Sequence, residues 1–338
     1  MDELLSLYRN GNVTIGKDVL FSEYIILWLD TISNAIERNT YEAYKATIYR
    51  YIEPYFSKVG TKLHSLEPKH IQEFYNYQTK NGLSASSVLR QHANIRKALE
   101  HAVKMNMIPY NPADRVTLPK KTKYNASFYS SEQVYKLLEV FKDEEMFSTV
   151  LLTSFYGFRR SEVLGLKWSH INFDTDTLII QDTVVRCGNT ESIDKPRTKN
   201  KASNRTLPLI PPMRAYLLSL KQSQAEDRAF LGAGYIVNDY VCKRKNGEPF
   251  KPNYLSCRFG KIIRRAKLPL IRFHDLRHSA ASMLLALGFS LKEIQEWLGH
   301  GDLATTANIY AHLQFKAKQD MAASLAEQIN IGNLLTVF

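Results

Sequence analysis

Apolar residues recur every three or four positions through residues 21–108, which is the spacing of an amphipathic helix. Polar, glycine and proline positions divide this stretch into four predicted helical segments: 21–32, 40–56, 66–82 and 86–106. Asn39 or Thr40 is placed to cap the second helix, and Ser84 or Ser86 is placed to cap the fourth. Four helices joined by short loops predict a small helical bundle.

The helical period stops after residue 108. Residues 109–126 contain three prolines and the basic residues Lys120, Lys121 and Lys123, with little periodicity. Such a stretch is typical of a domain boundary. We therefore predict an N-terminal extension (1–20), a helical domain (21–108), a linker (109–126) and a second domain (127–338). The lysines fit either a solvated linker or a segment that crosses a nucleic-acid backbone.

The second domain has a mixed pattern. A capped helix is predicted from Ser131, and residues 175–185 are rich in β-branched side chains and indicate a strand. Residues 203–210 indicate its antiparallel partner, with a basic loop between the two strands. Helical patterns return from Pro211 to the end. The whole chain is therefore predicted to be mainly α with a small antiparallel β-sheet.

Charge narrows the class of partner. The chain has 45 Lys and Arg against 33 Asp and Glu, a formal net charge of +12. This surplus favours a polyanion such as DNA, RNA or an acidic membrane surface, although a basic protein without such a partner is the alternative. The three cysteines are widely spaced and predict no metal site. With no signal peptide and no apolar run long enough to span a bilayer, a cytoplasmic protein is expected.

Two motifs have the chemistry of phosphate binding. In Gly157-Phe-Arg159-Arg160, two arginines follow a glycine at the start of a predicted helix. An arginine can donate two parallel hydrogen bonds to a phosphate, and a helix N-terminus adds positive potential. In His274-Asp-Leu-Arg277, the spacing of three places both side chains on one helical face. There the arginine can hold an anion while the histidine exchanges a proton. Taken singly, each motif also fits a surface ion pair or a polar helix start.

Two further segments are less specific. His300 follows a Leu-Gly helix end, and Tyr310 lies ten residues later on a predicted helix. A tyrosine among apolar neighbours usually belongs to a core, so this pair alone assigns no function. The loop between the predicted strands carries Lys195, Lys199 and Lys201. A lysine on such a loop can protonate a leaving oxygen, but a solvated loop explains the same residues.

Together, these motifs resemble the tyrosine recombinase (phage integrase) family, in particular integrases of phages and of integrative or conjugative elements of Gram-positive bacteria. The matching phrases are GFRRSEVLGLKW, HDLRHSAASMLLALG and EWLGHGDLATTANIYAHL, in the family's order. The resemblance covers the chain from Phe21 to the end. It implies a core-binding, SAM-like bundle followed by a catalytic domain, which together close on DNA as a C-shaped clamp. It also implies catalysis with no metal and no other cofactor.

The resemblance assigns a catalytic set of six residues by position: Arg159, Lys199, His274, Arg277, His300 and Tyr310. Arg160 occupies a position that is often apolar in the family, so Arg159 is the expected phosphate ligand. The assignment of Lys199 depends on the length of a variable loop. Lys201 is therefore a rival for the same role, and Lys195 is a weaker one.

The resemblance also implies a role for each group. Arg159 and Arg277 neutralise charge on the phosphoryl oxygens. Tyr310 attacks the phosphorus, which forms a 3′-phosphotyrosyl bond and frees a 5′-hydroxyl. Since free tyrosine has a pKa of about 10, His274 is expected to help remove its proton. Lys199 protonates the departing 5′-oxygen. Two rounds of exchange through a Holliday junction then integrate or excise a mobile element.

Partners follow from the same resemblance. His300 is expected to hydrogen-bond the phosphate or to share in proton transfer. The substrate is expected to be double-stranded DNA at specific recombination sites, bound by a homotetramer that assembles from monomers, with accessory factors that bend DNA or set direction and with no membrane involved. The tail after Tyr310 is expected to dock on a neighbouring subunit, with packing on its own domain as the alternative.

Two other functions fit part of the pattern. A type IB topoisomerase would share the Arg, Lys, His and Tyr chemistry but would relax supercoils. A non-catalytic DNA-binding regulator of the same fold would be expected to lack one of the six catalytic positions, and all six are occupied. Only about twenty residues precede the bundle, which is too few for the additional arm-site-binding domain that many such integrases carry. We therefore expect either an enzyme that recombines simple sites or a sequence that is part of a longer chain.

Overall fold

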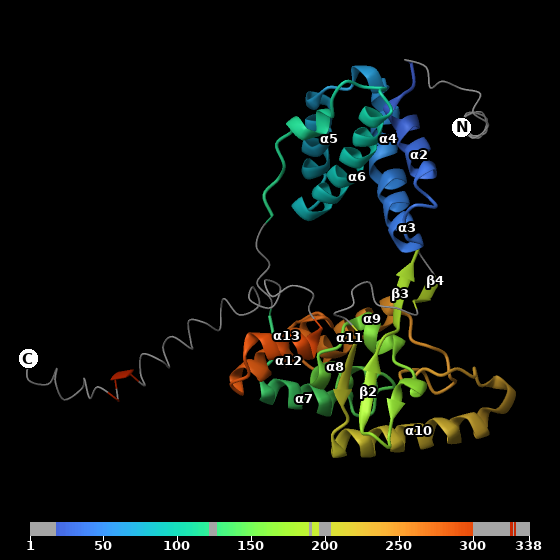
Figure 1. The fold of residues 1–338 in the computed structure, drawn as a ribbon, viewed down its shortest axis with the longest axis vertical. Coiled ribbons are helices and arrows are strands. Elements are labelled where there is room, and N and C mark those ends of the chain that lie inside the picture. The colour runs from blue at the N-terminus through green and yellow to red at the C-terminus, as the bar shows by residue number, and fades with distance from the viewer. Residues whose placement is uncertain are drawn as a thin grey trace, which may run out of the picture. The chain divides into compact units, whose positions relative to one another are not determined.

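The structure of the protein is a computed structural model, which describes residues 18–121, 127–188, 191–195, 204–299, 325, 326 and 328. These residues form two compact units. The first unit contains the helices up to residue 121, and the second contains the described residues from 127 onward apart from residues 187, 188 and 191. Each unit has a hydrophobic core of its own. Figure 1 shows both units and labels most of their helices and strands.

The first unit is a bundle of helices around an aromatic and aliphatic core. Its elements are α2 (Phe21–Thr31), α3 (Arg38–Thr47), a π-helical turn (Ile48–Ile52), α4 (Glu53–Val59), α5 (Pro68–Lys80) and α6 (Ala85–Lys104). The rings of Phe21 and Phe56 are fully buried and meet edge to face, with centroids 4.8 Å apart. Phe74, Ile48 and Ile95 are buried in the same core. The predicted helical bundle is therefore confirmed.

The predicted N-cap residue is wrong for α3 and correct for α6. α3 begins at Arg38 with Glu37 in the N-cap position, so the prediction of a cap at Asn39 or Thr40 is wrong. The physical reason is that the Glu37 carbonyl already accepts the Thr40 N–H at 2.8 Å, which starts the helix earlier. At α6 the prediction is correct, because the Ser84 side chain accepts a backbone N–H of the first turn.

The second predicted helix, 40–56, is divided in the structure. α3 continues into the π-helical turn, and α4 follows from Glu53. Pro54 lies at the start of α4 and has no N–H to donate to a carbonyl one turn back. The missing donor favours a local change in the hydrogen-bond pattern, and the wider π turn provides it.

The second unit is mostly helical and contains two small sheets. Its helices are α7 (Ser131–Phe141), α8 (Phe147–Tyr156), α9 (Arg160–Gly165), α10 (Pro211–Leu231), α11 (Pro252–Arg265), α12 (Asp275–Ala286) and α13 (Leu291–Leu298). Its strands are β1 (Ile171–Asn172), β2 (Thr177–Ile180), β3 (Thr183–Cys187), β4 (Glu191–Lys195) and β5 (Arg205–Pro208). β1, β2 and β5 form one antiparallel sheet, and β3 pairs with β4 in a second. The predicted fold class is confirmed.

The predicted pairing of residues 175–185 with 203–210 is confirmed at β2 and β5. These strands run antiparallel, with Leu178 opposite Leu207 and both side chains buried. The first predicted strand is nevertheless two strands, since β2 ends before Asp182 and β3 begins after it. The Asp182 carboxylate is buried and pairs with Lys167 Nζ at 2.8 Å, which takes this position out of the ladder.

The arrangement of helices brings three separated segments of the second unit together. α8 packs against α12 and α9, and α13 packs against α12 and β5. The ends of these helices carry residues 157–162, 274–278 and 298–299. The site described below is built from these segments and from the first residue of β5. No helix in the described part of the chain is both long enough and apolar enough to cross a membrane.

Candidate active site

The candidate site begins at the turn between α8 and α9. Gly157 ends α8 in the left-handed conformation (φ +66°), which favours glycine. A Cβ atom at this position would also collide with the Leu298 side chain on α13. Phe158 then turns into the core, and Arg159 becomes the N-cap residue of α9. The glycine two residues earlier therefore fixes where Arg159 enters the site.

Arg159 and Glu162 hold the first turn of α9 reciprocally. The Arg159 backbone N–H donates to Glu162 Oε2 at 2.9 Å, and the Arg159 guanidinium forms an ion pair with Glu162 Oε1. Another guanidinium nitrogen, Nη2, donates to the Gly299 carbonyl at 2.8 Å. The side chain of Arg159 is 31% exposed, whereas that of Glu162 is 1% exposed. Arg159 is thus fixed by protein contacts on one side and accessible to a ligand on the other.

Arg277 enters the same place from α12 and is the largest fully buried side chain in the described part of the chain. Its Nη1 donates to the Gly157 carbonyl at 2.7 Å, and its Nη2 donates to the Leu298 carbonyl at 2.6 Å. Nη1 also lies 3.7 Å from Glu162 Oε2. A buried guanidinium is costly unless it is paired and hydrogen-bonded, and these three acceptors meet that requirement.

Glu162 stands among three guanidinium groups. In addition to its contacts with Arg159 and Arg277, its Oε2 accepts a hydrogen bond from Arg205 Nη2 at 3.1 Å. Burial alone raises the pKa of a carboxyl group. Here the charges of Arg205, Arg277 and Arg159 outweigh burial and lower the pKa of Glu162 to about 2. The cluster therefore holds one ionised carboxylate among three positive charges at neutral pH.

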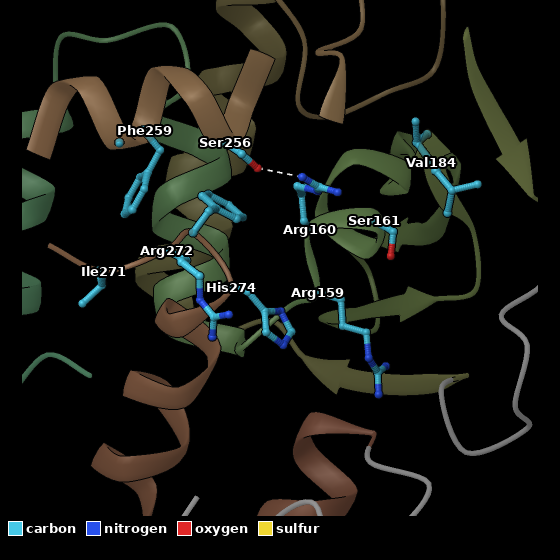
Figure 2. A pocket seen from close by; sticks show the side chains of 12 residues that line it. Arg159, Arg160, Ser161, Val184, Ser256, Phe259, Ile271, Arg272 and His274 are labelled. Carbon is cyan, nitrogen blue, oxygen red and sulfur yellow. Dashed lines mark hydrogen bonds between the residues drawn. The ribbon is translucent and has the colours of Figure 1, made fainter. Parts of the chain in front are cut away.

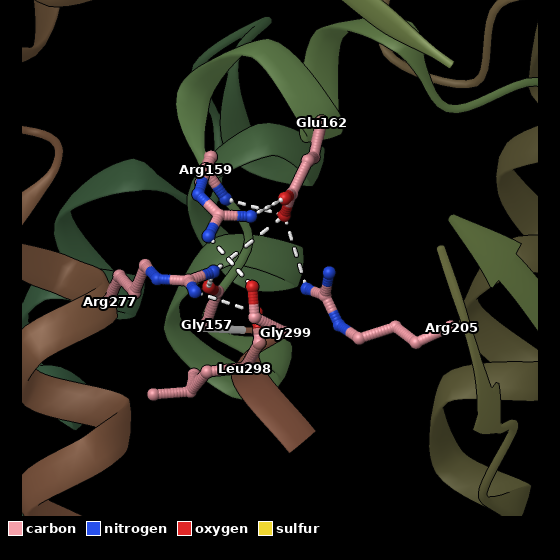
Figure 3. A network of polar contacts seen from close by, with 7 residues as sticks. All are labelled: Gly157, Arg159, Glu162, Arg205, Arg277, Leu298 and Gly299. Carbon is pink, nitrogen blue, oxygen red and sulfur yellow. Dashed lines mark hydrogen bonds and ion pairs between the residues drawn. The ribbon is translucent and has the colours of Figure 1, made fainter. Parts of the chain in front are cut away.

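Figure 3 shows how the two predicted phosphate ligands converge. Arg159 and Arg277 come from different helices, yet both contact Glu162. They also donate to the adjacent carbonyls of Gly299 and Leu298, at the end of α13. The two guanidiniums are therefore held by adjacent backbone carbonyls of one segment of the chain.

His274 lies at the N-cap of α12 and is exposed on one side. The next residue, Asp275, is fully buried and accepts hydrogen bonds from the Arg272 backbone at 2.8 Å and guanidinium at 2.7 Å. The His278 ring meets that of His274 edge-on, with centroids 5.3 Å apart. Desolvation by the surrounding protein, with smaller effects of His278 and Arg277, lowers the pKa of His274 to about 4. Its imidazole is therefore neutral at physiological pH and can accept a proton.

Arg159 and His274 line one cavity of about 780 Å³ in the second unit. Figure 2 shows the side chains of Arg159, Arg272 and His274, which line this cavity. Arg160 lines the same cavity but is directed to α11, where it donates to Ser256 Oγ at 2.7 Å. Although adjacent in sequence, Arg159 and Arg160 therefore have different surroundings, and only Arg159 takes part in the Glu162 cluster.

The remaining predicted site residues lie outside the described residues. They are Lys199, the rival Lys201, His300 and Tyr310. The third candidate lysine, Lys195, is the last residue of β4. Within the described part of the chain, no three His, Cys, Asp or Glu side chains lie together as metal ligands.

Sequence reasoning missed two members of the cluster, Glu162 and Arg205. Glu162 lies three residues after Arg159, which is the position of the acidic residue in a capping box, so that spacing could have indicated it. Arg205 gives no such local signal, because its partner is on a different element and 43 residues away.

The sequence profile of the phage integrase family matches residues 128–317, and the profile of the phage integrase N-terminal SAM-like domain matches residues 20–79. This chain belongs to the phage integrase family. The resemblance to tyrosine recombinases predicted from the sequence motifs is therefore confirmed.

Curated relatives of this phage integrase family member extend over nearly the whole chain. A XerC-like tyrosine recombinase of Caldanaerobacter subterraneus subsp. tengcongensis is 28% identical, with 96% of this chain and 87% of the relative covered. The ICEBs1 integrase of Bacillus subtilis is 26% identical, with 92% and 83% covered. These relatives are tyrosine recombinases and integrases by name, and their similarity to this chain covers both units.

Solved structures show the same fold. The Tn1549 transposon integrase in complex with transposon right end DNA superposes with a TM-score of 0.72 at 17% identity, covering 90% of this chain and 99% of that one. A lambda integrase tetramer bound to a Holliday junction gives a TM-score of 0.68 at 16% identity, covering 90% and 80%. At this level of identity the likeness establishes the fold of the second unit and the bundle, and no more.

Proposed function

We propose that this chain is a site-specific DNA recombinase, which breaks and rejoins DNA through a covalent 3′-phosphotyrosine formed by Tyr310. The observation that carries the proposal is the meeting of the Arg159 and Arg277 guanidiniums at Glu162, next to the cavity that His274 lines. Negative charge accumulates on the phosphoryl oxygens when a phosphodiester is attacked. Two guanidiniums held in fixed positions stabilise that charge without reorganising during the reaction.

The remaining roles follow from the order of proton transfers. Tyr310 attacks the phosphorus, and the neutral imidazole of His274 accepts the phenolic proton as the bond to phosphorus forms. Lys199 donates a proton to the departing 5′-oxygen, with Lys201 as the alternative donor. His300 hydrogen-bonds the phosphate. Rejoining reverses these steps, with a 5′-hydroxyl from a second duplex as the nucleophile.

The partners are proposed from the relatives. The Tn1549 integrase has been solved with transposon end DNA and with circular intermediate DNA, and lambda integrase as a tetramer on a Holliday junction. We infer that this chain acts on double-stranded DNA at defined sites, as a tetramer and through a Holliday junction, to integrate or excise a mobile element. Because that substrate is the DNA of a bacterial cell or its mobile element, the proposed compartment is the cytoplasm.

We propose a separate role for each of the domains predicted from the sequence. Residues 21–108 would bind the core recombination site and residues 127–338 would catalyse exchange. Residues 109–126 would connect the two, with residues 1–20 as an extension. The chain has 45 basic and 33 acidic residues, and this surplus of positive charge supports a role in DNA binding.

The decisive experiment uses a nicked suicide substrate, from which the 5′-hydroxyl fragment diffuses away after cleavage and leaves the protein trapped on DNA. The unsubstituted protein is expected to form a covalent adduct, and Tyr310→Phe to bind the same DNA without forming one. Tyr135→Phe is the matched control, because Tyr135 is 67% exposed on α7 and lies outside the site. An adduct trapped by Tyr310→Phe would show that another residue is the nucleophile.

A second substrate identifies the general acid. A 5′-bridging sulfur leaves without protonation, so it removes the need for the lysine. Lys199→Ala is expected to slow cleavage of ordinary DNA, and the sulfur is expected to restore the rate. If only Lys201→Ala behaves in this way, the role passes to Lys201.

A further inference from the structure

A third arginine reaches the site from a different element. Arg205 is the first residue of β5, where it pairs with Ile180 of β2. Its side chain is 7% exposed, and its guanidinium lies 5.8 Å from the centre of the buried Phe158 ring. From this position Arg205 Nη2 donates to Glu162 Oε2 at 3.1 Å. Arg205 does not line the cavity that Arg159 and His274 share.

The carboxylate of Glu162 creates an electrostatic conflict in the site. It orients the first predicted phosphate ligand, because Oε2 accepts the Arg159 backbone N–H and Oε1 pairs with its guanidinium. The same carboxylate also attracts Arg277, whose Nη1 lies 3.7 Å from Oε2. Its negative charge therefore competes with a phosphate for both arginines. In a buried site such interactions are only weakly screened. An orienting carboxylate without a further partner would therefore weaken the ligands that it positions.

We propose that Arg205 is a positioning residue that offsets Glu162, so that the carboxylate orients Arg159 and Arg277 without neutralising them; this inference rests on the proposed function. With Arg205, three positive charges and one negative charge leave the cluster at +2. Without Arg205 the same count gives +1. Arg205 acts through Glu162 and touches no reacting atom, which distinguishes it from the two phosphate ligands.

The test compares Arg205→Met with the unsubstituted protein in single-turnover adduct formation on two suicide substrates. One has an ordinary scissile phosphate, and the other has a methylphosphonate, whose neutral methyl group replaces a charged oxygen. On phosphate the variant is expected to be about 10- to 100-fold slower, since the loss of a direct charge contact costs about 100- to 1,000-fold and Arg205 acts indirectly. On methylphosphonate less charge must be stabilised, so the difference is expected to shrink to about threefold or less.

The matched control is Arg214→Met. Arg214 lies on α10 and pairs with Asp176 at 3.1 Å, so the control makes the same chemical change and also breaks an arginine–carboxylate pair. Its rates are expected to equal those of the unsubstituted protein on both substrates. Thermal unfolding and DNA affinity are measured for every variant, so that a folding defect is recognised.

Two further variants keep the inference testable if Arg205→Met is unstable. Arg205→Lys keeps the positive charge and is expected to retain more activity than Arg205→Met on phosphate. Adding Glu162→Gln to Arg205→Met removes the charge that Arg205 offsets, so the double variant is expected to cleave phosphate faster than Arg205→Met alone. A positive coupling of this kind is the signature of two residues that act on each other.

Several results would overturn the inference. Equal slowing of Arg205→Met on both substrates would make Arg205 a structural residue only. Recovery with a 5′-bridging sulfur but not with methylphosphonate would place its action at the leaving group. A double variant no faster than Arg205→Met would exclude the offset of Glu162. If the unsubstituted protein forms no adduct on the phosphate substrate, the proposed function fails as well, and that result is distinct from the other three.

Discussion

The two units bury polar groups in different ways. Among the described residues of the helical unit, the buried polar side chains are all neutral: Ser22, Gln78, Gln91, Asn94 and Asn111. The second unit buries neutral groups too, but it also contains all the buried charged residues in the described part of the chain: Glu162, Asp182, Asp275 and Arg277. The helical unit is therefore held by apolar packing, and the second unit by apolar packing with embedded ion pairs.

The positions of the buried charges show why the units differ. Three of the four lie in the candidate site. Glu162 pairs with Arg277, which is itself a candidate phosphate ligand, and Asp275 directly follows His274. A buried charge destabilises a fold unless its partners are well placed, and removing one partner is more costly than never having had the pair. In the second unit, buried charges lie where the proposed reaction needs charged groups in fixed positions. The helical unit has no such requirement and can rely on packing.

The largest expected effect comes from Arg277→Met. The substitution leaves the Gly157 and Leu298 carbonyls without their donor and leaves Glu162 with one cation fewer. We expect a loss of about 3–5 kcal/mol in the free energy of unfolding, because a buried charge pair is broken. Adduct formation is expected to fall by about 100- to 1,000-fold or more, because a charge-stabilising donor is lost. Urea unfolding and single-turnover cleavage measure the two effects. A variant as stable and as active as the unsubstituted protein would contradict the network.

The matching change in the helical unit is Phe56→Ala. Phe56 is fully buried and packs against Phe21 and Phe74, so the substitution opens a cavity. A comparable loss of about 3–5 kcal/mol is expected. Unlike Arg277→Met, this variant is expected to keep the unsubstituted rate of adduct formation at saturating DNA and low temperature, where the bundle stays folded. A slower chemical step under those conditions would show that the bundle does more than bind.

The same contrast explains what could be predicted from the sequence. Apolar periodicity predicted the bundle and the β2–β5 pairing, because burial of one face leaves a local signal. Arg159, His274 and Arg277 were predicted because their motifs are short and ordered, and the structure brings the two arginines to one carboxylate. Their roles, with those of Lys199, His300 and Tyr310, stay predictions.

What sequence missed depends on contacts between distant segments. Arg205 meets Glu162 only because β5 lies beside the start of α9 in the fold, and no local pattern encodes that approach. The break between β2 and β3 depends likewise on Lys167, which pairs with the buried Asp182. The π-helical turn before α4 follows from Pro54, which sequence shows, but the choice between a kink and a wider turn depends on packing.

A smaller effect is expected from Gly157→Ala, which disturbs backbone instead of charge. An alanine must adopt a φ of +66°, and its Cβ would collide with Leu298. The left-handed conformation alone costs about 1–2 kcal/mol for a residue other than glycine. Because the Leu298 carbonyl accepts from Arg277, a shift of α13 is expected to slow adduct formation roughly tenfold through misplacement of that arginine. Gly60→Ala in the helical unit is the control, since it has a similar φ of +70° but nothing within 4 Å of its Cβ. It is expected to lose stability without losing rate, and equal rates for both variants would refute the coupling.

The smallest expected effect is on how the free energy of unfolding depends on pH. One histidine in each unit is expected to have a similar effect on stability, but only the one in the second unit is expected to affect activity. In the fold the pKa of His274 is lowered to about 4, and burial also lowers the pKa of His92 in the helical unit. An unfolded histidine titrates at about 6.5, so below that pH the unfolded chain binds a proton that the folded chain does not, and this part of the stability declines as pH falls toward 4. His274→Gln and His92→Gln are therefore each expected to lose less stability than the unsubstituted protein between about pH 7.5 and about pH 5 in urea unfolding.

Of these two variants, only His274→Gln is expected to slow adduct formation, because only the His274 imidazole lines the cavity of the site. A His274→Gln variant as acid-sensitive as the unsubstituted protein would mean that the folded imidazole is well solvated and that its neutrality near pH 7 needs another cause.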